Sequence, residues 1–302
     1  MVKNESRVYV LITPVKDEEA LIGETITSVV GQSLLPSQWV IVSDGSTDRT
    51  EEIVSKASSR HSWIRLICLP PRKERSFAAV VHATESGVRA LTVSDYQYIG
   101  LLDSDVRFDP DYFKTMIQRF EENPRLGLGG GMVIDIGLSK RHPPRNLLDV
   151  PGATQFYRRR CYEDIGGLIA VPEGGWDALT CVRARMLGYE TRLFSDLVVD
   201  HLKPRNICNG GILERTCQLG MRDYALGYDP VFEFFKCMSR VFNEYPPVLA
   251  SAAWLAGYFA AGLTRRKRFI PNDLLRFSQT EQRKRLKQLF RNPGNQLCRD
   301  AK

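Results

Sequence analysis

No C-x-x-C pair occurs among the seven cysteines, which are scattered over the 302 residues. An odd number of dispersed cysteines argues against a zinc site or a disulfide framework and indicates reduced thiols in the cytosol. No charged leader with a long apolar stretch precedes the first β-branched run, so we expect no secretory or transit peptide. A Walker A loop is absent, and the glycines at 127 and 129 open no helix in a G-x-G-x-x-G frame, which argues against a dinucleotide oxidoreductase.

The positive charge is concentrated at the C-terminus. Residues 264–302 contain 12 Lys or Arg and three acidic residues, whereas the first 263 contain 30 basic and 32 acidic residues. A near-neutral body with a basic tail is unlike a uniformly basic nucleic-acid binder, so we expect no nucleic-acid partner. The hydrophobic share of 43% is that of a globular protein with a sizeable core.

Short β-branched runs alternate with helical periodicity through the first half of the chain. Strands are predicted at 8–13, 39–43, 64–69 and 98–102, and helices at 18–32, from 48, and at 77–91. This alternation predicts an α/β fold with a mainly parallel sheet flanked by helices, in which ligands bind at the carboxyl ends of the strands. Further strands are expected at 126–136 and 191–199, and a helix at 177–187 that ends at Gly188.

Asp103-Ser104-Asp105 directly follows the apolar run at 98–102. Two carboxylates at a strand end can both bind a hard divalent cation. The segment is not an EF-hand loop, because Arg107 and Phe108 occupy ligand and glycine positions. The structural alternative is a pair of turn-forming aspartates.

Two further segments follow predicted strands. In Asp44-Gly45-Ser46-Thr47-Asp48, Asp44 can accept a hydrogen bond from a base or ribose, and Asp48, three residues before Glu51, is placed to cap a helix in a capping box. In Thr13-Pro14-Val15-Lys16-Asp17-Glu18-Glu19, the acids taken singly are ordinary partners of a helix N-terminus.

These three segments, in this order, resemble the nucleotide-binding half of family 2 glycosyltransferases, which have the GT-A fold. The typical P-x-Y-N-E-E, D-G-S-x-D and D-x-D motifs correspond to residues 14–19, 44–48 and 103–105. The first motif differs from the family pattern, because Val15 and Lys16 occupy the x-Tyr positions and Asp17 stands in place of Asn. Gly174-Gly175-Trp176-Asp177 resembles the G-E-D segment with Trp in place of Glu, and the resemblance covers about residues 7–202.

The resemblance implies roles for individual residues. The donor would be bound by Pro14, Glu18, Asp44, Asp48, Asp103 and Arg75, the last from a basic cluster that is otherwise a solvated loop. Asp105, Asp103 and His201 would hold Mg²⁺ or Mn²⁺, with Asp105 the more direct ligand and Asp103 also near the ribose. Asp177 would be the catalytic base, with a simple helix cap as its alternative.

The implied function is inverting transfer of one sugar from a nucleotide-diphosphate sugar, UDP-linked, to a hydroxyl of a glycan or lipid-linked acceptor in cell-surface polysaccharide or glycolipid synthesis. The Q-x-x-R-W motif of processive synthases is not matched by the segment at 218–223, which predicts single additions. A nucleotidyltransferase on a related sheet and a degenerate membrane-bound scaffold remain as alternatives.

Residues 246–264 carry no charge and precede Arg265-Arg266-Lys267-Arg268. With Trp254, Tyr258 and Phe259, this segment predicts a membrane-associating anchor at the cytoplasmic face of a membrane. The alternative is a buried helix that packs on the catalytic domain. We therefore predict a catalytic domain at 1–240 and a helical, basic extension at 241–302.

Overall fold

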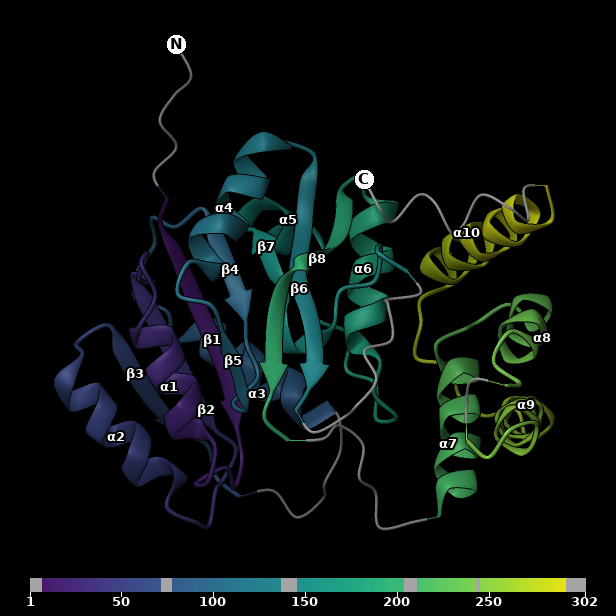
Figure 1. Ribbon diagram of the computed structural model, residues 1–302, viewed down its shortest axis with the longest axis horizontal. Coiled ribbons are helices and arrows are strands. Elements are labelled where there is room, and N and C mark those ends of the chain that lie inside the picture. Colours follow the sequence, from purple (N-terminus) through teal and green to yellow (C-terminus); the bar gives the residue numbers. More distant parts are fainter. Residues whose placement is uncertain (1–6, 72–77, 137–145, 204–210, 243–244, 292–302) are drawn as a thin grey trace. The chain divides into compact units, whose positions relative to one another are not determined.

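The computed structural model describes residues 7–71, 78–136, 146–203, 211–242 and 245–291 (Figure 1). The chain divides into two compact units, residues 1–207 and 208–302, which we call the sheet unit and the helical unit. The boundary expected at residue 240 falls inside the helical unit, because helices on both sides of it pack together there.

Eight strands form one sheet in the order β3-β2-β1-β4-β7-β6-β8-β5. Their bounds are β1 Tyr9–Val15, β2 Gln38–Ser43, β3 Ile64–Cys68, β4 Tyr98–Leu101, β5 Val106–Phe108, β6 Leu126–Asp135, β7 Phe156–Arg158 and β8 Glu190–His201. The pairs β3-β2, β2-β1, β1-β4 and β6-β8 are parallel, whereas β7 runs antiparallel to both of its neighbours and β5 antiparallel to β8. The expected mainly parallel α/β sheet is thus confirmed, and β1, β2, β4, β6 and β8 all end at the same edge.

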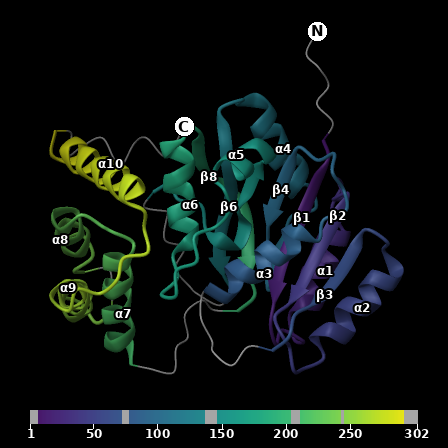
Figure 2. The same cartoon turned by 180° about the vertical axis from the view of Figure 1, so that it is seen from behind.

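Helices cover both faces of this sheet (Figures 1 and 2). In the sheet unit they are α1 Ile22–Val30, α2 Thr50–Arg60, α3 Ala78–Arg89, α4 Tyr112–Glu122, α5 Arg159–Asp164 and α6 Trp176–Met186, with a 3₁₀ turn at Gly152–Thr154. Because side chains alternate along a strand, Tyr9 and Leu11 pack with α1, α2 and α4, while Val10 and Ile12 pack with α3, α5 and α6. Both faces are therefore buried, as a mainly parallel sheet requires.

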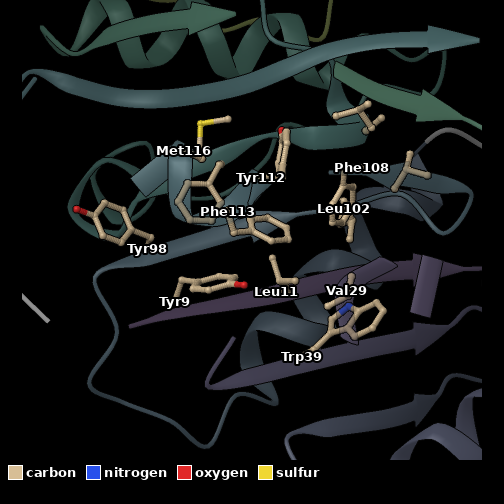
Figure 3. Packing of buried hydrophobic residues seen from close by; sticks show 14 of the residues in the cluster. Tyr9, Leu11, Val29, Trp39, Tyr98, Leu102, Phe108, Tyr112, Phe113 and Met116 are labelled. Carbon is tan, nitrogen blue, oxygen red and sulfur yellow. The ribbon is translucent and has the colours of Figure 1, made fainter. Parts of the chain in front are cut away.

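The first of these cores is rich in aromatic rings (Figure 3). Tyr9 lies with its ring centroid 5.0 Å from that of Phe113 and 5.8 Å from that of Phe156. The indole N–H of Trp39 is fully buried and donates to Thr13 Oγ1 at 2.9 Å, so its polar atom is satisfied. This packing fixes β1 and β2, whose carboxyl ends carry the first two motifs.

The first helix is shorter than predicted and begins at Ile22 rather than at residue 18. Residues 19–21 form a turn instead, in which the backbone N–H groups of Leu21 and Ile22 donate to Glu18 O, and Asp17 before this turn has a φ of 52°, in the left-handed region. Asn and Asp tolerate this conformation better than other residues with a side chain, which accounts for Asp at a position where the family motif has Asn. The strand predicted at 191–199 is longer than expected, since it extends to His201.

The helical unit consists of α7 Ile212–Ala225, α8 Pro230–Met238, α9 Leu249–Leu263 and α10 Asn272–Arg291. Helices α7 and α9 touch backbone to backbone: a Cβ at Gly220 would lie 1.9 Å from Trp254 O, and one at Gly257 would lie 2.0 Å from Cys217 O. Trp254 and Tyr258 are buried. The prediction that Trp254 and Tyr258 contact a membrane as part of an anchor at 246–264 is therefore wrong, because both rings pack within the helical unit. Within the residues described, no helix is both long and apolar enough to span a bilayer.

Candidate active site

The carboxyl edge of the sheet brings the predicted acidic segments together. Strands β2 and β3 lie on one side of β1, and β4 lies on its other side, so the strand order reverses between β1 and β4. Open α/β sheets bind ligands at such a reversal. The segment after β1 contains Glu18, and the segment after β4 contains Asp103 and Asp105.

Strand register places His201 beside this reversal. His201 is opposite Val106 in the antiparallel β5-β8 pair and opposite Asp135 in the parallel β6-β8 pair. As a result, one ligand atom each from Asp103, Asp105 and His201 lies within 4.8 Å of the other two. The structure thus groups the three residues that the sequence assigned to a metal.

The tautomer of His201 follows from its neighbours. Its Nδ1 contacts the carbonyl oxygen of Lys203, which can only accept, so Nδ1 carries the proton. In the neutral ring the lone pair of Nε2 faces Asp105, whose Oδ1 lies 3.4 Å away, whereas in the charged ring Nε2–H pairs with that carboxylate. An unprotonated imidazole nitrogen and two carboxylates suit Mn²⁺ and, with more oxygen ligands, Mg²⁺.

Burial shapes the charge of this cluster. Asp105 is buried, which raises the pKa of its carboxyl, while His201 and Lys203 act to lower it; the resulting pKa lies above the ordinary 3.8. Asp135 adds to the rise, because its carboxylate is close to the same site. Several acids held this close favour the binding of a cation. The residues present therefore fit the divalent metal that the motif implies.

Two residues of this region were missed by sequence reasoning. The Oδ1 atom of Asp135 lies 3.6 Å from His201 Nδ1, and Lys203 Nζ binds Glu18 Oε1 at 2.9 Å. The Lys203 contact joins the first motif to the end of β8. Asp135 had one usable signal, its place at the end of a strand expected in the same sheet.

The residues predicted to bind the donor lie at the ends of β1 and β2. Pro14 lies opposite Val42 in the β1-β2 ladder, and the backbone N–H of Asp44 donates to Val15 O at 2.9 Å. Asp44 is buried at 6% exposure. Gly45 has a φ of 69°, and a Cβ there would lie 2.4 Å from Pro71 Cα, so only glycine fits this turn. Arg75, predicted to contact the donor, lies outside the described residues.

Asp48 has a clear structural role. Its carboxylate accepts from the backbone N–H of Glu19 at 2.9 Å and of Thr50 at 3.0 Å. Burial acts to raise the pKa of Asp48, but these hydrogen bonds outweigh it and lower the pKa below its usual value. The predicted capping box is wrong, because α2 begins at Thr50 with Arg49 at its N-cap, and Glu51 accepts from Ser43 Oγ instead. A direct contact of Asp48 with the donor stays a prediction.

Asp177 lies in the first turn of α6. Gly174 and Gly175 have φ values of 84° and 91°, a conformation that turns the chain sharply into the helix. The Asp177 carboxylate accepts from the Gly152 N–H at 3.1 Å through Oδ2. Its backbone carbonyl accepts from Gln155 Nε2, also at 3.1 Å, and Gln155 is fully buried. Asp177 is thus oriented by the 3₁₀ turn and the residue that follows it.

The same turn also contacts Asp103 of the Asp103–Asp105–His201 cluster. The backbone N–H of Asp103 donates to Ala153 O at 3.1 Å, one residue from the Gly152 N–H that binds Asp177. We call the Gly152–Ala153 pair the bridging peptide. It ties the segment after β4 directly to the start of α6, so Asp103 and Asp177 are both attached to this turn.

Fold and site together are those of an α/β protein with an acid-and-histidine cluster at the switch point of its sheet. The family model described as "Glycosyl transferase family 2" matches residues 10–170, more than half of the chain. The chain therefore belongs to glycosyl transferase family 2 and is a glycosyltransferase.

Poly-beta-1,6-N-acetyl-D-glucosamine synthase of Staphylococcus epidermidis is 27% identical over 111 residues, which are 37% of this chain and 25% of the synthase. The chain thus matches about a quarter of the length of that relative. Among solved structures, the mannosyltransferase PcManGT of Pyrobaculum calidifontis, in complex with GDP-Man and Mn²⁺, covers 95% of this chain and 87% of its own, with 18% identity and a TM-score of 0.55. The structure of S. aureus TarS 1-349 in complex with UDP-GlcNAc covers 95% of this chain and 92% of its own, with 13% identity and a TM-score of 0.53. These structural likenesses show the fold.

Proposed function

We propose that the protein is an inverting, metal-dependent transferase that moves one sugar from a UDP-linked donor to a hydroxyl of a glycan or lipid-linked acceptor. We further propose that it acts in cell-surface polysaccharide or glycolipid synthesis. The observation that supports the proposal is the bridging peptide, which accepts from the backbone N–H of Asp103 and donates to the carboxylate of Asp177, and so links the Asp103–Asp105–His201 cluster to the start of α6.

The donor would bind across the strand reversal. Asp44 at the end of β2 would accept from the base or ribose, and the cluster would hold the diphosphate through Mg²⁺ or Mn²⁺. When bound, the divalent cation would stabilise the charge of the departing diphosphate. Lys203, already paired with Glu18, adds a positive group on the same side. The choice of UDP is supported by the TarS complex, a protein of the same fold.

Asp177 would act on the acceptor. Its carboxylate removes the hydroxyl proton as the acceptor oxygen bonds to the anomeric carbon, and the bond from that carbon to the diphosphate oxygen breaks with its electron pair leaving on the diphosphate. A single displacement of this kind inverts the anomeric centre. The Gly152 N–H keeps the base aligned with the reacting centre, which is the geometric contribution of the fold.

Thermal unfolding with a panel of nucleotides tests the donor assignment. We expect UDP with Mn²⁺ to stabilise the wild type by about 2.7 kcal/mol at a concentration of 100 Kd, and EDTA or Asp105→Ala to remove this effect. Release of UDP from UDP-GlcNAc, and the anomeric configuration of the product by NMR, test the reaction. A response only to a nucleoside triphosphate would refute the proposal and favour a nucleotidyltransferase, in which Asp177 has no role.

A further inference from the structure

Helix α8 exposes its apolar stripe to solvent and buries a charged side chain, the reverse of an ordinary amphipathic helix. Val231, Phe234, Phe235 and Met238, at the i, i+3, i+4 and i+7 positions of one face, are all exposed, between 39% and 56%. The opposite face carries Glu233, which is fully buried. In a water-exposed helix the apolar stripe normally faces the core, so this arrangement needs a reason.

The buried side of α8 takes part in an ion network. Lys236 Nζ binds Glu233 Oε2 at 2.6 Å and also contacts Asp223 of α7, which accepts from Trp254 Nε1 at 2.8 Å. Asp229, just before α8, is fully buried and pairs with Arg283 at 2.7 Å. The described part of the helical unit contains fourteen basic and six acidic residues, and three of the acidic residues are buried. The outer surface of the unit is strongly positive.

The apolar surface continues beyond α8. Phe235 touches Phe290 of α10, with ring centroids 5.1 Å apart, and Phe290 is 66% exposed. The chain after α8 adds Phe242 at 86% and Tyr245 at 75% exposure. Among the described residues, fourteen of the eighteen exposed large hydrophobic side chains belong to the helical unit. We call Val231, Phe234, Phe235, Met238 and Phe290 together the α8 face.

Basic groups border this face. The last part of α10 carries no acid from Arg283 onward and contains Arg283, Lys284, Arg285, Lys287 and Arg291. The Arg285 guanidinium lies 5.7 Å from the ring centroid of Phe232, which places that basic segment at the edge of α8. Both Figures 1 and 2 show α8 and α10 as neighbours within the helical unit.

We infer that the α8 face binds the surface of an anionic lipid bilayer. The aromatic and aliphatic side chains would enter the boundary between headgroups and acyl chains, and the basic border would meet the lipid phosphates. A second copy of the chain is disfavoured as the occupant, because a two-fold contact through this face would bring two basic borders together. This inference does not depend on the transfer reaction proposed above.

Flotation of the full chain with vesicles tests the inference. We expect binding to vesicles that contain phosphatidylglycerol and much weaker binding to phosphatidylcholine alone. Phe234→Asp combined with Phe290→Asp should weaken binding at least about tenfold, since two exposed rings would no longer enter the lipid. Lys287→Gln should weaken binding to the anionic vesicles about fivefold.

Leu35→Asp is the matched control, because Leu35 is 45% exposed but belongs to the sheet unit, and its vesicle binding should be unchanged. Circular dichroism would verify that each variant is folded, and UDP release in solution without vesicles should be the same in the double variant and the wild type. Absence of wild-type binding to anionic vesicles would overturn the inference. Undiminished vesicle binding by the double variant would also overturn the inference. A dimer that light scattering detects in the wild type, and that the double variant abolishes while vesicle binding stays the same, would likewise overturn it.

Discussion

Replacing Gly152 by alanine tests the link between the 3₁₀ turn and the proposed base. A Cβ at this position would lie 2.8 Å from Trp176 Cζ2 and 3.3 Å from Asp177 Cβ. Ordinary contact begins at 3.4 Å, so α6 or the turn must move by about 0.6 Å. Overpacking of this kind costs about 1 to 3 kcal/mol of folding free energy. Because the shift separates Asp177 from its Gly152 partner, we expect kcat to fall by roughly 10- to 100-fold.

The assay is UDP release from UDP-GlcNAc at saturating Mn²⁺, together with thermal unfolding. Gly23→Ala is the matched control, because a Cβ at Gly23 meets no atom within 4 Å and the position is inside helix α1. That variant should keep its kcat and gain about 0.5 to 1 kcal/mol of stability. A Gly152→Ala variant with wild-type kcat and stability would show that the turn does not set the position of Asp177.

Three further predictions concern single carboxylates. Asp177→Asn should lower kcat by about 10²- to 10⁴-fold while leaving stabilisation by UDP and Mn²⁺ intact, as thermal unfolding would show. Asp135→Asn should weaken Mn²⁺ binding about tenfold in a direct titration with UDP present, because the site loses a nearby negative charge; unchanged affinity would contradict this role. Asp223→Asn should destabilise the helical unit by about 3 to 5 kcal/mol in urea unfolding. Burial acts to raise the pKa of Asp223, but Lys236 and Arg222 hold it below 3.8, so its contribution is complete above that pH and is lost as the pH falls below it; the Asn variant should lack this acid sensitivity.

The parallel half of the fold could be predicted from sequence because its signals are local. The strand expected at 39–43 is β2 Gln38–Ser43, and the one at 64–69 is β3 Ile64–Cys68. Strand β2 is buried throughout, β3 lies at the sheet edge and is buried only at Ile64, and both are β-branched or aliphatic runs bounded by turn residues. The grouping of Asp103 with Asp105 needed no knowledge of distant contacts.

The rest depends on contacts between distant segments. Asp135 faces His201 only through the parallel register of β6 and β8, which shifts at a bulge between Gly131 and Met132. The bridging peptide arises from pairing beside β4, which no local pattern indicates. In α8 the apolar stripe predicts burial of that face, but the ion pairs of Glu233 and Lys236 take the inner position.

The bridging peptide has a mechanical consequence. Since Asp103 and Asp177 are both fastened to adjacent residues of one rigid turn, fluctuations of the sheet edge and of α6 should be correlated at these two points. Thermal motion would then displace Asp103 and Asp177 together and leave the separation of their attachment points nearly constant. Accommodation of sugars of different size must accordingly come from other parts of the wall, so descendants of this chain can change substrate without resetting the distance over which the reaction occurs.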